Sequence, residues 1–152
     1  DRLVQMGLKV RFIGSGDAVG KIKTLGAQVD NPCSPKEVPN VLSQGDIGLL
    51  HLPNRTEWKG ASPLKVSEYA AAGMCVISSN VSGLSEFSDE EWLTLVPLGD
   101  DSGFLSATNE LIELGMDEIR RRGELARQWA IQNRDWSVCG NDLENFIVSS
   151  LN

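Results

Sequence analysis

Short apolar runs alternate with longer polar stretches along the first hundred residues of the chain. Five runs have the length and apolar content of strands, and they lie at residues 8–13, 27–30, 46–52, 74–77 and 92–96. The run at 46–52 is rich in apolar residues on both faces, which fits a buried strand of a parallel sheet. Because helix-like segments separate the runs, we predict an α/β fold. Its core would be a Rossmann-like parallel sheet of about five strands with helices on both faces.

Helical spacing accounts for much of the remaining chain. Short helical segments are expected at 19–25 and 39–44, a longer one from Ser62 to Ala72, and a helical C-terminal tail at 102–114, 117–133 and 138–150. Ser62 and Pro63 suit the N-cap and first position of the longer helix, and Gly73 suits the position after its end. The chain has no internal repeat and no low-complexity linker, so we expect a single domain over residues 1–152.

Composition and charge exclude several classes of protein. Apolar residues make up 41% of the chain and charged residues 23%, and the formal net charge is −7. The one basic cluster, Arg120 to Arg122, is interleaved with Glu118 and Glu124 and is interpreted as a solvated helix face. We therefore expect no nucleic-acid partner. No apolar run approaches the roughly 18 residues of a membrane span, so we expect none.

The cysteines indicate neither a disulfide framework nor a metal site. Cys33, Cys75 and Cys139 are widely spaced, form no C-x-x-C pair and are accompanied by a single histidine, His51. Cys75 lies in an apolar run and is expected to be a small buried residue. The pattern suits a reducing cytoplasm, and we expect no metal and no other cofactor.

Ligands of open parallel sheets bind beyond the carboxyl ends of the strands, and the first such loop is rich in glycine. Gly14 and Gly16 follow the first strand, and Gly20 comes four residues later. This spacing would let backbone amides approach a phosphate at a helix N-terminus. It is also typical of a tight turn that needs positive φ. Asp30, at the end of the next strand, could serve as the ribose ligand of a dinucleotide site.

A second motif spans residues 60–78 and combines a helix start with two charged residues. Lys65 stands in the first turn, where the helix dipole makes a cation unfavourable unless an anion such as a diphosphate shares the site. Glu68 follows on the same helix, and its carboxylate could accept hydrogen bonds from the two hydroxyls of a ribose. The alternative is a surface ion pair between Lys65 and Glu68, three residues apart.

This motif, S-P-L-K-x-x-E-Y-x-A-A-G-x-x-V-I-S, resembles the donor-binding segment of GT-B-fold glycosyltransferases of the retaining, E-x7-E type. The resemblance implies that Glu68 binds the ribose hydroxyls of a sugar nucleotide. It also implies that amides from Ala61 to Lys65 bind the diphosphate. Other pieces agree in order along the chain, at residues 10–16, 44–50, 83–86 and 134–137.

The sequence departs from the family pattern in two respects. The first Glu of the E-x7-E motif should stand at position 60, which is Gly60 here. That difference affects recognition of the transferred sugar, unless Glu57 reaches the site from the neighbouring loop. The basic residues that neutralise the diphosphate in the family, and its acceptor-binding N-terminal domain, lie outside this chain.

We therefore expect the donor-binding domain of a glycosyltransferase, which transfers a sugar from a nucleotide-diphosphate sugar to an acceptor. Lys65 is the expected catalytic residue, and the expected substrate-binding residues are Gly14, Gly16, Gly60, Ala61, Ser62, Leu64, Lys65 and Glu68. The isolated domain is expected to be inactive. Two alternatives stay open: a non-catalytic nucleotide-binding or regulatory module of the same fold, and an NAD(P)-dependent oxidoreductase built on the first glycine loop.

The last helix carries an apolar stripe at helical spacing. Its members are Val138, Leu143, Phe146, Ile147 and Leu151. In the family that the chain resembles, this helix packs across the other domain, so we expect part of the stripe to be uncovered here. The alternative is a helix that folds back onto its own sheet.

Overall fold

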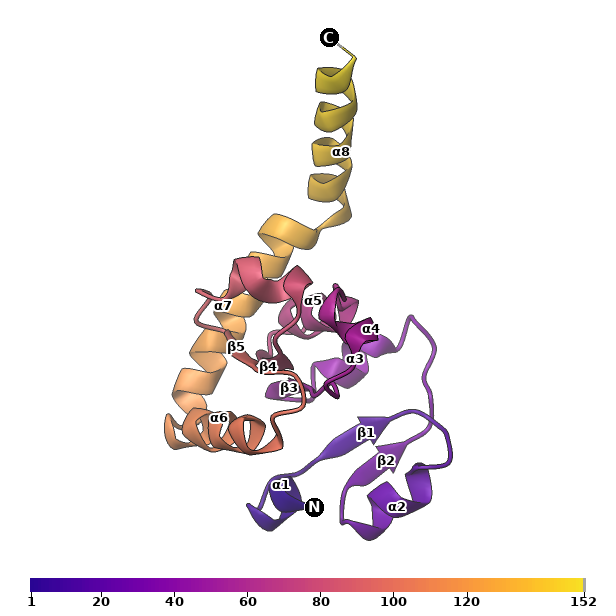
Figure 1. Ribbon diagram of the computed structural model, residues 1–152, viewed down its shortest axis with the longest axis vertical. Helices are drawn as coiled ribbons and strands as arrows, with labels where there is room; N and C mark the ends of the chain where they lie inside the picture. The colour runs from indigo at the N-terminus through magenta and orange to yellow at the C-terminus, as the bar shows by residue number, and fades with distance from the viewer. Residues whose placement is uncertain (152) are drawn as a thin grey trace. The chain divides into compact units, whose positions relative to one another are not determined.

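The computed structural model describes residues 1–151, which form two compact units, residues 1–41 and the residues from Leu42 onward. All five predicted strands are present, and every strand pairing is parallel. The strands form a two-stranded sheet in the first unit and a three-stranded sheet in the second, with helices around them (Figure 1). The predicted α/β fold class with a helical tail is therefore confirmed.

The first unit is a small β–α–β arrangement. Its elements are α1 (Arg2–Gln5), β1 (Arg11–Ile13), α2 (Val19–Thr24) and β2 (Gln28–Asp30), and α3 (Val38–Leu42) contains the boundary between the units. Strand β1 is shorter than the predicted 8–13, because the ladder pairs only Arg11 to Ile13 with β2. Phe12 in its centre is 47% exposed, so this unit by itself builds little core.

The second unit contains the main hydrophobic core. Its strands are β3 (Ile47–Leu50), β4 (Cys75–Ser79) and β5 (Leu93–Val96), in the order β3-β4-β5. The helices packed on this sheet are α5 (Leu64–Ala71), α6 (Asp101–Glu113) and α7 (Met116–Arg134), and the shorter elements are α4 (Thr56–Lys59) and the 3-10 helix η1 (Ser82–Phe87). These two short helices lie in the connections that follow β3 and β4.

Alternation along the central strand divides the core into two clusters. All five residues of β4 are buried, as a strand enclosed on both faces requires. Val76 packs in a cluster with Val66 of α5 and Trp129 of α7. Cys75 and Ile77 face the opposite cluster, which includes Phe104 of α6. Helices therefore cover both faces of this sheet, and the predicted burial of Cys75 is confirmed.

Helices α5 and α7 approach each other very closely at one point. A Cβ atom added at Gly123 of α7 would lie 2.1 Å from the carbonyl oxygen of Gly73, just after α5. Gly73 has a φ of 79°, which confirms its predicted role in ending the helix. The absence of side chains at these two glycines thus allows the end of α5 to lie against the middle of α7.

The basic cluster of α7 is neutralised by carboxylates. The Arg121 side chain contacts both Glu118 and Glu91, and Arg122 donates to Glu118 at 2.9 Å. These two guanidinium groups lower the pKa of Glu118 from 4.5 to about 2. These contacts agree with the interpretation of Arg120 to Arg122 as a helix face that is solvated and not a nucleic-acid site, although among the described residues Glu91 pairs with the cluster and Glu124 does not.

The tail helix α8 (Trp136–Ser150) is separate from α7, because Asp135 between them has an extended backbone with ψ of 140°. No residue of α8 is buried. The exposed fraction is 68% for Phe146, 49% for Ile147 and 82% for Leu151. The alternative in which this helix folds back onto its own sheet is therefore wrong. None of the helices within residues 1–151 combines the length and apolar composition of a membrane span.

Candidate functional site

The carboxyl ends of the three strands in the second unit are joined by hydrogen bonds from the loops that follow them. The buried hydroxyl of Ser79 accepts a hydrogen bond from the Leu52 amide at 2.8 Å and contacts the Leu52 carbonyl oxygen at 3.3 Å. The Gly99 amide donates to the same carbonyl at 3.1 Å, and the Asn80 amide donates to Val96 at 2.6 Å. These hydrogen bonds fix the first residues of each loop relative to the neighbouring strands.

Helix α5 begins at this edge, one residue later than predicted. Pro63 is the N-cap residue with an extended backbone, ψ 114°, and Leu64 is the first helical residue. The predicted assignment of Ser62 as N-cap is therefore wrong. The proline ring fixes φ of Pro63 at −75°, a value that suits both the N-cap and the first helical position, but its ψ keeps the backbone extended there. A proline side chain cannot accept a hydrogen bond, so the first-turn amides are not capped by it. They carry the positive end of the helix dipole.

One face of α5 anchors the helix and the other faces outward. Val66 is 2% exposed and Ala70 is fully buried, whereas Leu64 is 77% exposed. Leu64, an expected substrate-binding residue, is therefore an exposed apolar side chain at the first position of α5.

Lys65 and Glu68 form an ion pair on the exposed side of α5. Lys65 Nζ lies 2.6 Å from Glu68 Oε2, and both side chains are substantially exposed. This is the ion pair that the i,i+3 spacing offered as the alternative to ligand binding. At an exposed helical position such a pair contributes only about 0.2–0.5 kcal/mol, so a ligand could separate the two residues at small cost.

A groove of about 640 Å³ opens beside the start of α5. It includes three predicted site residues, Ser62, Leu64 and Glu68, and the start of η1 at Gly83. Its remaining lining residues are Pro63, Val66, Ser67, Ala71, Leu84, Phe87, Arg127, Trp129, Ala130, Ile131, Arg134, Asp135, Trp136 and Cys139. The structure therefore brings part of the predicted site to one concave surface of largely apolar character.

The groove contains residues that the sequence did not assign to the site. Arg134 lies over the rings of Phe87 and Trp129, with its guanidinium carbon 5.2 and 5.3 Å from their centres, in cation–π contact. Trp136 is 91% exposed at the start of α8. Asp135 caps that helix by accepting from the Ser137 amide at 2.8 Å. Contacts to the Ser137 hydroxyl and amide lower the pKa of Asp135.

Position 60 has room for a larger side chain. Gly60 ends α4 with φ of −94°, and an added Cβ would meet no described atom within 4 Å. Neither its backbone nor its surroundings therefore require glycine. Glu57 lies in the first turn of α4. That Glu57 acts in place of the motif's first Glu stays a prediction.

The first glycine loop belongs to the first unit. Gly16 has φ of 131°, and the Gly14 amide donates to the Asp30 carbonyl at 3.0 Å, which is consistent with a turn that needs glycine. The carboxylate of Asp30 accepts hydrogen bonds from Gln28 and Arg11, and these lower its pKa. The structure thus gives Asp30 partners within its own unit. Its role as a ribose ligand stays a prediction. The part of Gly14 and Gly16 in substrate binding stays a prediction.

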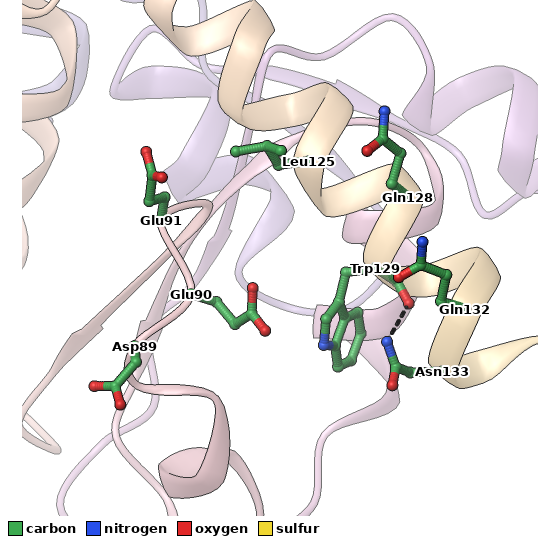
Figure 2. Close-up of a pocket in the computed structure, with 8 residues that line it drawn as sticks. All are labelled: Asp89, Glu90, Glu91, Leu125, Gln128, Trp129, Gln132 and Asn133. Atoms are coloured by element: carbon green, nitrogen blue, oxygen red, sulfur yellow. Dashed lines mark hydrogen bonds between the residues drawn. The ribbon is translucent and has the colours of Figure 1, made fainter.

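A second pocket, of about 400 Å³, lies between the segment before β5 and α7 (Figure 2). Asp89, Glu90 and Glu91 line one side, and amide side chains of α7, including Asn133, line the other. Glu91 is engaged by Arg121. Nowhere in residues 1–151 do three metal-ligating side chains gather as a metal site needs. None of the predicted site residues lines this pocket.

Comparison with known proteins connects this arrangement to sugar transfer. A family model described as "Glycosyl transferases group 1" matches residues 2–114. The chain is also similar to the "Putative teichuronic acid biosynthesis glycosyltransferase TuaH" of Bacillus subtilis (strain 168). The two are 27% identical over 106 residues, which is 70% of this chain and 26% of that protein. The chain thus spans about a quarter of the length of the relative that it matches.

Proposed function

This chain belongs to the group 1 glycosyl transferases, and we propose that it supplies the binding site for the donor, a nucleotide-diphosphate sugar. The observation that carries the proposal is the groove at the start of α5, which Ser62, Leu64 and Glu68 line. A helix N-terminus without a side-chain cap attracts an anion, and an apolar groove beside it suits the flat face of a base.

Glu68 is the proposed ligand of the ribose. An ionised carboxylate offers acceptors to both hydroxyls of a vicinal diol. Lys65 would leave Glu68 when the donor arrives and turn its ammonium group toward the diphosphate. Breaking the weak surface ion pair costs little free energy, and the lysine gains a more highly charged anionic partner in the diphosphate.

Sugar transfer breaks the bond between the anomeric carbon and the diphosphate oxygen, and the bonding electrons leave with the diphosphate. Lys65 and the backbone amides of Ser62, Leu64 and Lys65 would stabilise the negative charge that develops on this leaving group. Pro63 has no amide hydrogen, and the Ala61 amide already donates to the Trp58 carbonyl at 3.0 Å. The acceptor must be held at the same carbon, which is the part we assign to a second, N-terminal domain. We therefore expect the 152-residue chain alone to transfer no sugar at a measurable rate. The retaining outcome and a cytoplasmic location are further parts of the proposal.

Thermal shift with a panel of nucleotides tests the proposal. UDP, GDP, ADP and CMP, each with and without an attached sugar, would be added to the chain at increasing concentration. A ligand that binds only the folded state raises the melting temperature, and we expect at least one nucleoside diphosphate to do so. CMP, with a single phosphate, should act more weakly than the best diphosphate. If none of the compounds changes the melting temperature at millimolar concentration, the proposed site is wrong.

A non-catalytic module is the second candidate, and the observation that favours it is Gly60 in place of the motif's first Glu. Such a module would bind a nucleoside diphosphate as tightly as the sugar nucleotide. A donor site should instead bind one sugar nucleotide more tightly than its parent diphosphate. Comparing those two affinities separates the candidates.

A further inference from the structure

The start of η1 and the loop before α5 lie so close together that only glycine fits between them. A Cβ atom added at Gly83 would lie 2.7 Å from Ser62 Cβ, and 2.8 Å from both Ser62 Cα and the Ala61 carbonyl oxygen. Carbon atoms in ordinary contact are about 3.5–4.0 Å apart. The φ of Gly83 is not positive, so its backbone conformation does not demand glycine. The close approach of the loop does.

A hydrogen bond joins the same two segments. The Gly83 amide donates to the Ala61 carbonyl at 3.2 Å. Pro63, which follows in the loop, has no amide hydrogen to donate, and the Ala61 amide donates to Trp58 in the preceding helix α4 at 3.0 Å. The Ala61 carbonyl thus connects the loop to η1. Through it the loop before α5 is held by η1.

η1 itself is firmly attached to the sheet. Val81 and Leu84, on either side of the contact, are 2% and 4% exposed and belong to the main core. The Asn80 amide just before them donates to Val96 of β5. A shift of η1 would therefore disturb the core, and a side chain at position 83 would move the exposed loop instead.

We propose that Gly83 is a positioning residue, which sets the place of the loop 60–63 and of the first amides of α5. This inference rests on the proposed function, since these amides are the ones assigned to the diphosphate. We call η1 and the loop 60–63 together the clamp. In the proposal, the diphosphate binds at the side of the loop where α5 begins.

Substitution of Gly83 by Ala tests the clamp, with Gly140→Ala as the matched control. A Cβ at Gly140, in α8, would meet no described atom within 4 Å. Calorimetry would use the tightest of UDP, GDP and ADP, and also its parent nucleoside, which lacks phosphate. Gly83→Ala should weaken binding of the diphosphate roughly ten- to a hundredfold, as expected for misplaced binding groups. The affinity for the nucleoside should fall by a smaller factor than that for the diphosphate, since the amides that the loop positions are assigned to the phosphates.

Hydrogen exchange of the unchanged chain gives a second measurement, which does not depend on how well the variant folds. If η1 and the loop act as one clamp, the diphosphate should protect the amides of Ser62, Leu64 and Lys65 together with those of Gly83 and Leu84. Protection confined to Ser62, Leu64 and Lys65 would overturn the role of Gly83, and so would equal diphosphate affinity in Gly83→Ala and in the unchanged chain. Failure of the unchanged chain to bind any of the three diphosphates would instead overturn the proposed function.

Discussion

Glu68 is the residue on which the proposed site depends most, because it is both a groove residue and half of an ion pair. We expect Glu68→Ala to weaken binding of a nucleoside diphosphate roughly tenfold or more, since hydrogen bonds to a charged group contribute about 1.5–3 kcal/mol. Isothermal calorimetry measures this directly. Glu144→Ala, on the exposed tail helix, is the control and should bind normally. Unchanged affinity in Glu68→Ala would remove this carboxylate from the site.

Glu118 gives a prediction about pH. Its pKa is lowered from 4.5 to about 2 by Arg121 and Arg122, so the folded chain favours the ionised form more than the unfolded chain does. Its contribution to stability is complete above about pH 4.5 and is lost as the pH falls through about 2. Glu118→Gln should therefore unfold at lower urea concentration than the unchanged chain at pH 7, and the difference should shrink below pH 4.5. With Glu144→Gln as the control, a difference that is constant with pH would contradict the prediction.

At the scale of single residues, the sequence predicted what local geometry determines. Lys65 and Glu68 are three apart in a helix, so their proximity follows from the helix itself. Arg134 and Trp136 come to the groove from α7 and α8, more than sixty residues from Lys65 along the chain. Nothing in their local sequence reports that approach, because it is created by the packing of α7 against α5 and the sheet.

The contact between α5 and α7 determines how these two elements pack, and Gly123 is the residue that permits it. Gly123→Ala would place a methyl group 2.1 Å from the Gly73 carbonyl oxygen, and backbone must move to admit it. Alanine favours helix by up to about 1 kcal/mol over glycine, so any loss of stability comes from overpacking. We expect a net loss of roughly 1–3 kcal/mol in the free energy of unfolding, measured by urea denaturation.

Gly140→Ala is the matched control for this substitution, since that glycine is also helical but has open space around it. It should leave stability unchanged or raise it slightly. Equal effects of the two substitutions would show that α5 and α7 are not packed as closely as described.

The bounds of the helices and strands show which features of the structure the sequence pattern predicts and which it does not. The strands at 74–77 and 92–96 and the tail helices were predicted to within a few residues, because apolar periodicity and Gly73 mark them clearly. The start of α5 was one residue wrong, since Ser62 and Pro63 are both acceptable at more than one capping position. Strand β1 was overestimated, because its length depends on how far β2 pairs with it.

At the scale of the whole molecule, α8 is the helix whose apolar side chains are left uncovered by the rest of residues 1–151. Leu143, Phe146, Ile147 and Leu151 are between 49% and 82% exposed, on a helix that buries no residue. A contiguous apolar stripe of this kind is typical of an interaction surface. Our proposal is that it packs on the N-terminal domain assigned to the acceptor.

Two matched phenylalanine substitutions test this interpretation of the tail. Phe146 is 68% exposed on α8, whereas Phe104 of α6 is 5% exposed in the core, against Ile77 and Val96. Phe104→Ala should lower the free energy of unfolding by roughly 3–5 kcal/mol, because it leaves a cavity. Phe146→Ala should change it by less than about 0.5 kcal/mol, as at other surface positions. It should also reduce any concentration-dependent association seen by sedimentation velocity, since the stripe is the surface available for it. A loss of stability in Phe146→Ala comparable to that in Phe104→Ala would mean that α8 packs on its own domain, and the cross-domain interpretation would then be wrong.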